Sequence, residues 1–275
     1  MLSGNSNLEP YNMTEHRFIA YVTLADTDMC RVTAQTIVER VKTRFGGKIS
    51  MDIKPPTSQA GGILIDIDGV LITVMLIDKP LPPDATERAL QLDRVWPDAR
   101  ETIARNKAHV IIATLNPITN HGQALNSAAY VSFVAASVMD MTNATSLVWE
   151  AGDAITKAET FQQATDALAE KQLPVLSWMS LAIGQGPPTA TGAPTVIMRT
   201  RGVAPFAGRE IEFAPSTWPP AQMADRVIGT ALYLMQRGPV VKDGDTLGNT
   251  SSERITVHLE GETVRLQLEG VSQWV

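Results

Sequence analysis

Residues 196–216 read VIMRTRGVAPFAGREIEFAPS, and this stretch sets the pattern for the second half of the chain. Two β-rich arms, 196–203 and 210–213, flank a segment that contains Gly202 and Gly208. Glycine accepts a positive φ at no steric cost, so this segment is expected to turn the chain back on itself. The two arms are therefore predicted to pair as antiparallel strands.

Four charged side chains stand on these arms: Arg199 and Arg201 on the first, Glu210 and Glu212 on the second. Side chains two residues apart on a strand share a face, so the two pairs are expected to form a cross-strand charged ladder. Solvent-facing ion pairs of this kind contribute about 0–1 kcal/mol each. The ladder has two interpretations, either outer salt bridges of a sheet or a charged surface that binds a ligand or a partner.

The composition excludes several functional classes. The 275-residue chain is 44% hydrophobic and 19% charged, which is typical of a folded globular protein. Its net charge is −6 and no basic cluster is visible, so we expect no nucleic-acid partner. No apolar run reaches the roughly 18–20 residues that cross a bilayer, so no membrane association is expected. The single Cys30 and a polar start without a signal-peptide core favour a cytoplasmic protein.

Strand and helix patterns alternate without strict βαβ order, so the sequence predicts an α+β fold with mixed or antiparallel sheets and packed helices. The order of elements in residues 17–114 suggests a ferredoxin-like unit, and residues 175–269 could form a second one. The apolar run 175–183 is expected to be a strand, and residues 122–141 a long, largely buried helix.

Three regions are expected along the chain. Residues 1–15 should be a disordered tail, residues 16–150 an N-terminal α+β half, and residues 151–275 a C-terminal α+β half. A single continuous domain is the alternative. The Gly/Pro-rich loop 184–194 joins two strands of the second half and could act as a lid.

One motif resembles the first motif of haloacid-dehalogenase-type phosphatases. In the run Ile-Leu-Ile-Asp-Ile-Asp-Gly, Asp66 would attack phosphorus and Asp68 would protonate the leaving group. Thr114 and Asp245 can be fitted to the remaining positions. The competing interpretation is a type I′ hairpin with Asp68-Gly69 at its tip, because both central residues of that turn need a positive φ.

No other catalytic or metal signature stands out. The four histidines form no His-x-x-x-His or His-x-His pair, and Cys30 has no identifiable partner base. The chain has no Gly-x-Ser-x-Gly elbow, P-loop or dinucleotide fingerprint. We therefore expect neither a metal nor a cofactor.

The segment 195–265 is similar to the bacterial domain of unknown function DUF4261. The resemblance rests on Thr-Arg-Gly, Phe-Ala-Gly-Arg-Glu-Ile-Glu, then a helix, then Lys-Asp-Gly-Asp-Thr-Leu-Gly. It implies seven motif positions, with turn formation and local capping as their simplest roles: Gly202, Glu210, Glu212, Gly244, Asp245, Thr246 and Gly248. Gly208 is expected to shape the same turn as Gly202.

Some members of this family resemble accessory or self-protection proteins encoded near bacterial secretion and toxin loci. Our leading hypothesis is accordingly a non-enzymatic bacterial protein that binds another protein, as an adaptor or an immunity-like factor. The alternatives are a metal-dependent phosphohydrolase that uses Asp66 and Asp68, and a small-molecule-binding domain with a pocket between its halves. The sequence leaves the oligomeric state and the identity of the partner open.

Overall fold

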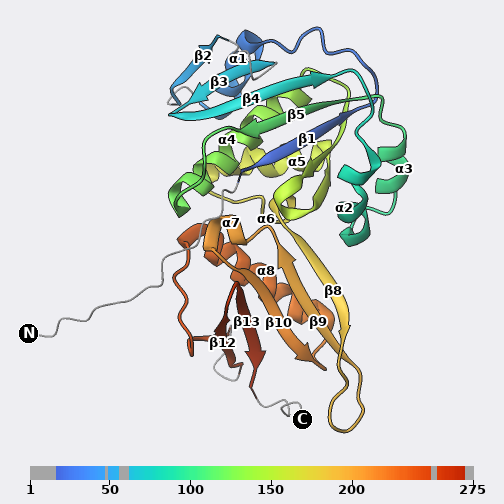
Figure 1. Ribbon diagram of the computed structural model, residues 1–275, viewed down its shortest axis with the longest axis vertical. Coiled ribbons are helices and arrows are strands. Elements are labelled where there is room, and N and C mark those ends of the chain that lie inside the picture. Colours follow the sequence, from blue (N-terminus) through green and yellow to red (C-terminus); the bar gives the residue numbers. More distant parts are fainter. Residues whose placement is uncertain (1–16, 47–48, 56–61, 249–252, 270–275) are drawn as a thin grey trace, which may run out of the picture.

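The computed structural model describes residues 17–46, 49–55, 62–248 and 253–269. It has two β-sheets with packed helices, which confirms the predicted α+β class. The molecule is elongated, with one sheet in each of two lobes stacked along the long axis (Figure 1). The tail expected over residues 1–15 lies outside the described residues.

The first lobe is built on a seven-stranded sheet. Its strands are β1 (Ile19–Leu24), β2 (Met51–Lys54), β3 (Ile63–Ile67), β4 (Val70–Ile77), β5 (Ala108–Thr114), β6 (Ala144–Trp149) and β7 (Ala154–Lys157). They lie in the order β2-β3-β4-β5-β1-β6-β7, and every neighbouring pair is antiparallel. β7 was not predicted from the sequence.

Helices cover both faces of this sheet. One face carries α1 (Ala34–Phe45), α4 (His121–Met139) and α5 (Ala158–Asp166), and the other face carries α2 (Glu87–Leu92) and α3 (Ala99–Ala104). α1 begins at a capping box between Thr33 and Thr36, which satisfies its first backbone donors. α4 contacts α1, α5, α7 (Ala204–Ala207) and three strands, which explains why its sequence is apolar on nearly every side.

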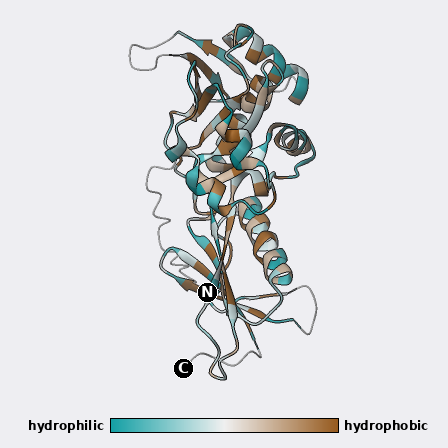
Figure 2. Ribbon diagram, turned by 90° about the vertical axis from the view of Figure 1, so that its right-hand side faces the viewer, coloured by the Kyte–Doolittle hydropathy of each residue, from teal (hydrophilic) through white to brown (hydrophobic). Residues whose placement is uncertain are grey.

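The second lobe has a six-stranded sheet with one long helix. Its strands are β8 (Ser180–Gly186), β9 (Thr195–Arg201), β10 (Glu210–Ser216), β11 (Thr246–Leu247), β12 (Ile255–Glu260) and β13 (Thr263–Leu268). The order is β11-β12-β13-β10-β9-β8, with a parallel pair between β10 and β13. α8 (Pro220–Arg237) packs on one face through residues such as Val227 and Leu234, and it lies alongside the second sheet (Figure 2).

Four fully buried aromatic rings join the lobes. Phe18 and Trp149 of the first lobe stack with Trp178 and Phe206, at centroid separations of 5.3–5.9 Å. Trp178 ends the short helix α6 (Val175–Trp178), and its indole N–H donates to Ser132 Oγ of α4 at 2.9 Å. Aromatic pairs stabilise by about 0.5–1.5 kcal/mol beyond the area they bury. The two lobes therefore share one hydrophobic core.

Three expectations about the architecture need correction. The boundary at residue 151 falls between β6 and β7, which pair with each other, so the first sheet extends to Lys157. Neither sheet has the ferredoxin-like order. In the first, β4 pairs with β5 and β1 lies between β5 and β6; in the second, the consecutive strands β8 and β9 pair directly with each other. Residues 175–183 are not one strand: Pro174 precedes the turn of helix α6, and β8 begins only at Ser180.

None of the helices in the described ranges is long and apolar enough to cross a membrane.

Candidate functional site

Glu210 holds together the connection between β9 and β10. Its Oε1 accepts hydrogen bonds from the backbone N–H groups of Gly202 (2.8 Å) and Ala204 (3.1 Å). Its Oε2 accepts from Val203 N–H (3.2 Å) and from Thr200 Oγ1 (2.7 Å). These donors lie just before and within the first turn of α7, where a carboxylate satisfies them well. Glu210 is therefore a structural clamp for this turn.

The connection itself differs from the predicted short turn. The helix α7 occupies it, with Gly202 at φ 108° before the helix and Gly208 at φ 74° as its left-handed cap. Both conformations favour glycine, as the sequence indicated. The two flanking strands nevertheless pair in antiparallel fashion, with Arg199 opposite Glu212.

Of the two cross-strand ion pairs in the predicted charged ladder, one forms. Glu212 is 8% exposed and forms ion pairs with Arg199 Nε from β9 and with Arg265 Nη2 from β13, the latter at 2.8 Å. Arg265 also pairs with Glu260 at 2.9 Å. Ala182, Arg199, Glu212, Arg265 and His258 lie side by side across five strands and form the row that faces away from α8.

The predicted ladder required an ion pair between Arg201 and Glu210, and this pair does not form. Arg201 Nε forms an ion pair with Asp153, which also pairs with Arg88 Nε at 2.8 Å. Asp153 follows β6 in the first lobe, so this ion pair joins the two lobes. The reason for the difference is that Glu210 is already held by α7, which leaves Arg201 to meet the other lobe.

The loop 242–248 has the predicted turn character. Gly244 has φ 82°, and Asp245 Oδ2 accepts from Lys242 N–H at 2.8 Å. Thr246 begins β11 and lies opposite Thr256. A Cβ on Gly248 would stand 2.1 Å from the carbonyl oxygen of Glu253, so this position has room only for glycine.

The four candidate phosphatase residues are not brought together. Asp68 and Gly69 are exposed at the tip of the β3–β4 hairpin with φ of 49° and 86°, as the hairpin interpretation predicted. Asp66 accepts from Gly69 N–H, whereas Thr114 is buried in β5 and accepts from Phe18 N–H. Asp245 lies in the other lobe. Within the described ranges, no three His, Cys, Asp or Glu side chains are close enough to hold a metal ion.

A large open groove lies where the two lobes meet, with a volume of about 800 Å³. We call it the interlobe groove. Its walls are the end of α2 and the following loop, β7, α5, the segment before and within α6, the start of β8, and α8. Apolar side chains dominate these walls: Leu92, Val95, Trp96, Ile155, Leu173, Val175, Leu176, Leu181, Ile183, Ile228 and Leu232.

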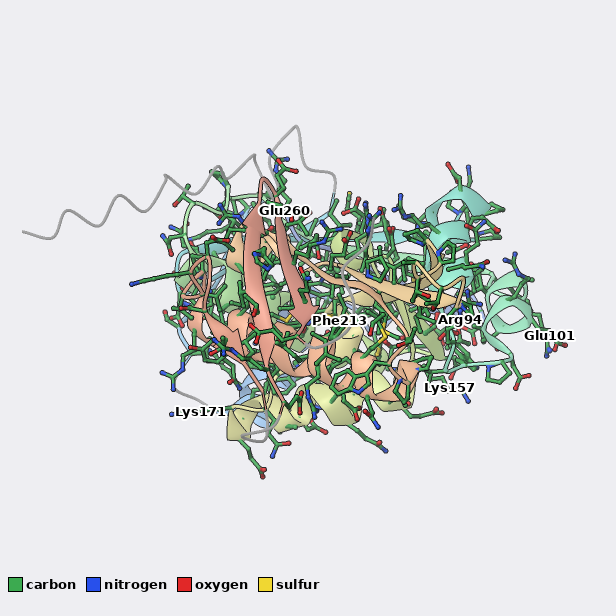
Figure 3. The ribbon with its side chains drawn as sticks, turned by 90° about the horizontal axis from the view of Figure 1, so that it is seen from below. Arg94, Glu101, Lys157, Lys171, Phe213 and Glu260 are labelled. Carbon is green, nitrogen blue, oxygen red and sulfur yellow. The ribbon has the colours of Figure 1, made fainter. Side chains whose placement is uncertain are left out.

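The lining of the groove carries two cations and two carboxylates. Its charged lining residues are Asp93, Arg94, Asp153 and Lys157, and Arg88 and Arg201 are ion-paired to Asp153. Because Asp153 is paired with two arginines, Arg94 and Lys157 are the lining cations that form no ion pair within the described residues. Lys157 Nζ lies 5.5 Å from the ring centre of Trp96. Arg94 and Lys157 lie on the same flank of the molecule in the view from below (Figure 3).

The expected lid is not part of the groove. The lining ends at Ile183, and the loop 184–194 continues away from it toward the far end of the second lobe (Figure 1). The sequence did not single out Asp153, Lys157 or Leu176, because their juxtaposition depends on how the lobes dock. No local pattern marks these residues, because Leu176 belongs to the apolar run 175–183, which is equally compatible with a buried strand.

Comparison with known proteins agrees with part of the sequence analysis. Residues 199–268 match the family described as a domain of unknown function (DUF4261), which confirms the resemblance over this segment. The match covers β10 to β13, α7, α8 and the end of β9. No curated protein and no solved structure matches the chain. The first lobe and the groove wall formed by α2, β7 and α6 lie outside the matched segment.

Proposed function

We propose that this protein is a non-enzymatic binding protein, and that it engages another protein through the interlobe groove. One observation carries the proposal. Among the described residues, six large hydrophobic side chains are exposed, and three of them line this groove: Val95 at 86%, Leu176 at 57% and Ile183 at 42%. Exposed apolar side chains that gather in one concave surface are typical of a protein interaction site.

Charge favours an acidic partner. Arg94 and Lys157 form no ion pair within the described residues, so the groove offers two cationic side chains to anionic groups of a partner. Arg94 and Lys157 stand beside the apolar walls. We therefore expect the bound segment to carry apolar residues for the groove and acidic residues for its rim.

The groove also supports a second candidate function, the binding of a small amphipathic anion. Its volume of about 800 Å³ is within the range of roughly 300–1,000 Å³ of ligand pockets. Ser180 is one of the lining residues, although its hydroxyl oxygen is buried and forms no hydrogen bond within the described part of the chain. The apolar walls of the groove and the cationic Arg94 and Lys157 suit an anion that has an apolar part.

The adaptor and immunity-like roles expected from the sequence belong to the first candidate. They differ only in the partner: an immunity factor binds a toxin, and an adaptor binds a component of a larger assembly. The identity of the protein that occupies the groove therefore distinguishes between them.

Site-specific photocrosslinking tests the proposal. A photoreactive phenylalanine analogue replaces Leu176 in the groove or, as a control, Val240, which is 44% exposed and does not line it. We expect a protein adduct in cells from position 176 and not from position 240. The identified protein is then purified, and Leu176→Glu should weaken its binding at least about tenfold, whereas Val240→Glu should change it less than about twofold.

The outcomes separate the two candidates. Equal effects of the two substitutions would contradict binding in the groove. Two results together would replace protein binding by binding of a small anion as the function. Position 176 would give no protein adduct, and native mass spectrometry of the purified chain would show a bound small anion that Leu176→Glu removes.

A further inference from the structure

β8 is an edge strand that lacks the usual protection. It pairs with β9 on one side, and no described strand pairs with its other side. Its seven residues, Ser-Leu-Ala-Ile-Gly-Gln-Gly, contain no charge and no proline, and its register with β9 is regular from Ser180 to Gly186. Natural proteins block such edges with charges, prolines, bulges or short strands, because a free edge pairs with other chains.

The other sheet edges in the described ranges are protected. β2 has four residues, including the charged Asp52 and Lys54. β7 also has four residues and contacts the helices α2, α5 and α6. β11 has two residues. β7 and β8 both line the interlobe groove and both contact α2, but of these two edge strands only β8 has seven residues and no charge.

The hydrophobic layer under the second sheet is open at this edge. Ile183, Met198, Phe213, Leu266 and Val257 lie side by side across five strands. The last four are fully buried at 0% exposure, whereas Ile183 is 42% exposed. The row of core residues thus ends at the groove, which Ile228 and Leu232 of α8 also line.

We infer that the partner contributes an extended segment that pairs with β8 as a seventh strand of the second sheet. This inference rests on the proposed function and specifies how the groove is filled. Alternate apolar residues of the added strand continue the row beyond Ile183 and cover Ile228 and Leu232. Backbone hydrogen bonds to β8 supply affinity and the buried side chains supply specificity, as in other cases of strand addition. An acidic residue at one end of the segment lies near Arg94 and Lys157.

Charge argues against a second copy of this chain as the occupant. Antiparallel pairing of β8 with β8 of another copy would bring Arg94 and Lys157 of both grooves to one interface. Like charges that face each other across an interface weaken the contact. A segment with acidic residues has the complementary charge.

Three synthetic peptides test the inference on the full-length protein. The parent peptide has eight residues with valine at alternate positions, serine and threonine between them, two terminal glutamates and blocked ends. Two methylated variants of this peptide carry backbone N-methyl groups, one on the odd residues and the other on the even residues. A strand pairs with its neighbour through the N–H groups of alternate residues, which lie at one edge. We therefore expect one methylated variant to bind at least about tenfold more weakly than the parent and the other to bind within about threefold.

Matched variants locate the binding at β8. Ile183→Lys should weaken binding of the parent peptide at least about tenfold, because it places a charge in the open row. Ile53→Lys is the control, since Ile53 is 45% exposed on the edge strand β2 of the other sheet and should leave binding unchanged. Binding of the parent peptide should also slow hydrogen exchange of the β8 amides in the wild-type chain.

Each other result overturns the inference. Equal binding of all three peptides would mean that the segment binds in the groove without backbone pairing to β8. That result would contradict the inference but not the proposed function. Absence of binding by the parent peptide at about 1 mM would exclude strand addition by a segment of this kind. A dimer of the free protein that Ile183→Lys converts to a monomer would make a second copy the occupant.

Discussion

Gly202 and Gly152 lie in direct backbone contact beneath the carbonyl group of Trp178. A Cβ on Gly202 would stand 2.7 Å from Gly152 Cα and 2.4 Å from Trp178 O. A Cβ on Gly152 would stand 2.2 Å from the same oxygen. Three segments meet here: the turn after β6, the end of α6 and the end of β9. Close docking of the two lobes thus requires glycine at both positions.

Gly202→Ala should destabilise the protein by roughly 2–4 kcal/mol, because it adds a backbone clash at a residue with φ 108°. Gly229→Ala is the matched control, since Gly229 lies within α8 and has nothing within 4 Å of the added Cβ. That change should stabilise by about 0.5–1 kcal/mol. The midpoints of urea unfolding at unchanged m-value measure both effects. Similar midpoints for the two variants would contradict the close contact.

Glu210→Ala should destabilise by about 2–3 kcal/mol, because it leaves the donors of Gly202, Val203 and Ala204 without the carboxylate that they share. Glu262→Ala provides the comparison, since this exposed residue lies nearby at the β12–β13 turn and should change stability by less than about 0.5 kcal/mol. Thermal or urea unfolding gives both values. If Glu210→Ala is as mild as Glu262→Ala, the carboxylate does not hold the turn.

The features that the sequence predicted well depend on local rules. Asp68-Gly69 forms the expected hairpin tip, because a two-residue turn with both φ values positive is encoded by those two residues alone. The hairpin around Gly261 is also encoded locally, with a positive φ of 55° at the glycine alone, the first of its two turn residues. The pairing of Arg199 with Glu212 also followed from the period of the strands and the turn between them.

The features that escaped prediction depend on contacts between distant segments. The apolar run 175–183 fits a strand or a buried helix equally well, and its helical part follows from the packing of Trp178 between the lobes. The partner of Arg201 is Asp153, 48 positions earlier in the chain, and nothing local indicates it. The interlobe groove exists only once both lobes have folded and docked, so no stretch of sequence contains its signal.

The two arginines that share Glu212 should differ in their effect on stability. Arg199 is 65% exposed, so Arg199→Ala should cost no more than about 1 kcal/mol. Arg265 is 33% exposed and bridges Glu212 and Glu260, so Arg265→Ala should cost more, roughly 1.5–3 kcal/mol. Urea unfolding of each variant and of the double variant checks the order. A larger loss for Arg199→Ala would show that the exposed ion pair is the stronger one.

Tyr130 gives a prediction for alkaline pH. Its hydroxyl donates a hydrogen bond to Asp68 Oδ2 at 2.9 Å, and burial together with the Asp68 charge raises the pKa of Tyr130 to about 12. In the unfolded chain a tyrosine titrates near pH 10. The pKa is higher in the folded state, so the contribution of Tyr130 to stability is complete below about pH 10 and is lost as the pH rises toward about 12.

Tyr130→Phe removes both the titrating group and its hydrogen bond, so the variant should be less stable than the wild type near neutral pH. Its stability should then fall less steeply than that of the wild type between about pH 10 and 12, and the two should converge. Some slope should remain, because burial, Glu150 and Asp84 also raise the pKa of Tyr21. Urea unfolding at a series of pH values measures the difference, with Tyr233→Phe as the control at a tyrosine that is 45% exposed. A constant gap between wild type and Tyr130→Phe across this pH window would show that the hydroxyl keeps its proton equally well in the folded and unfolded chain.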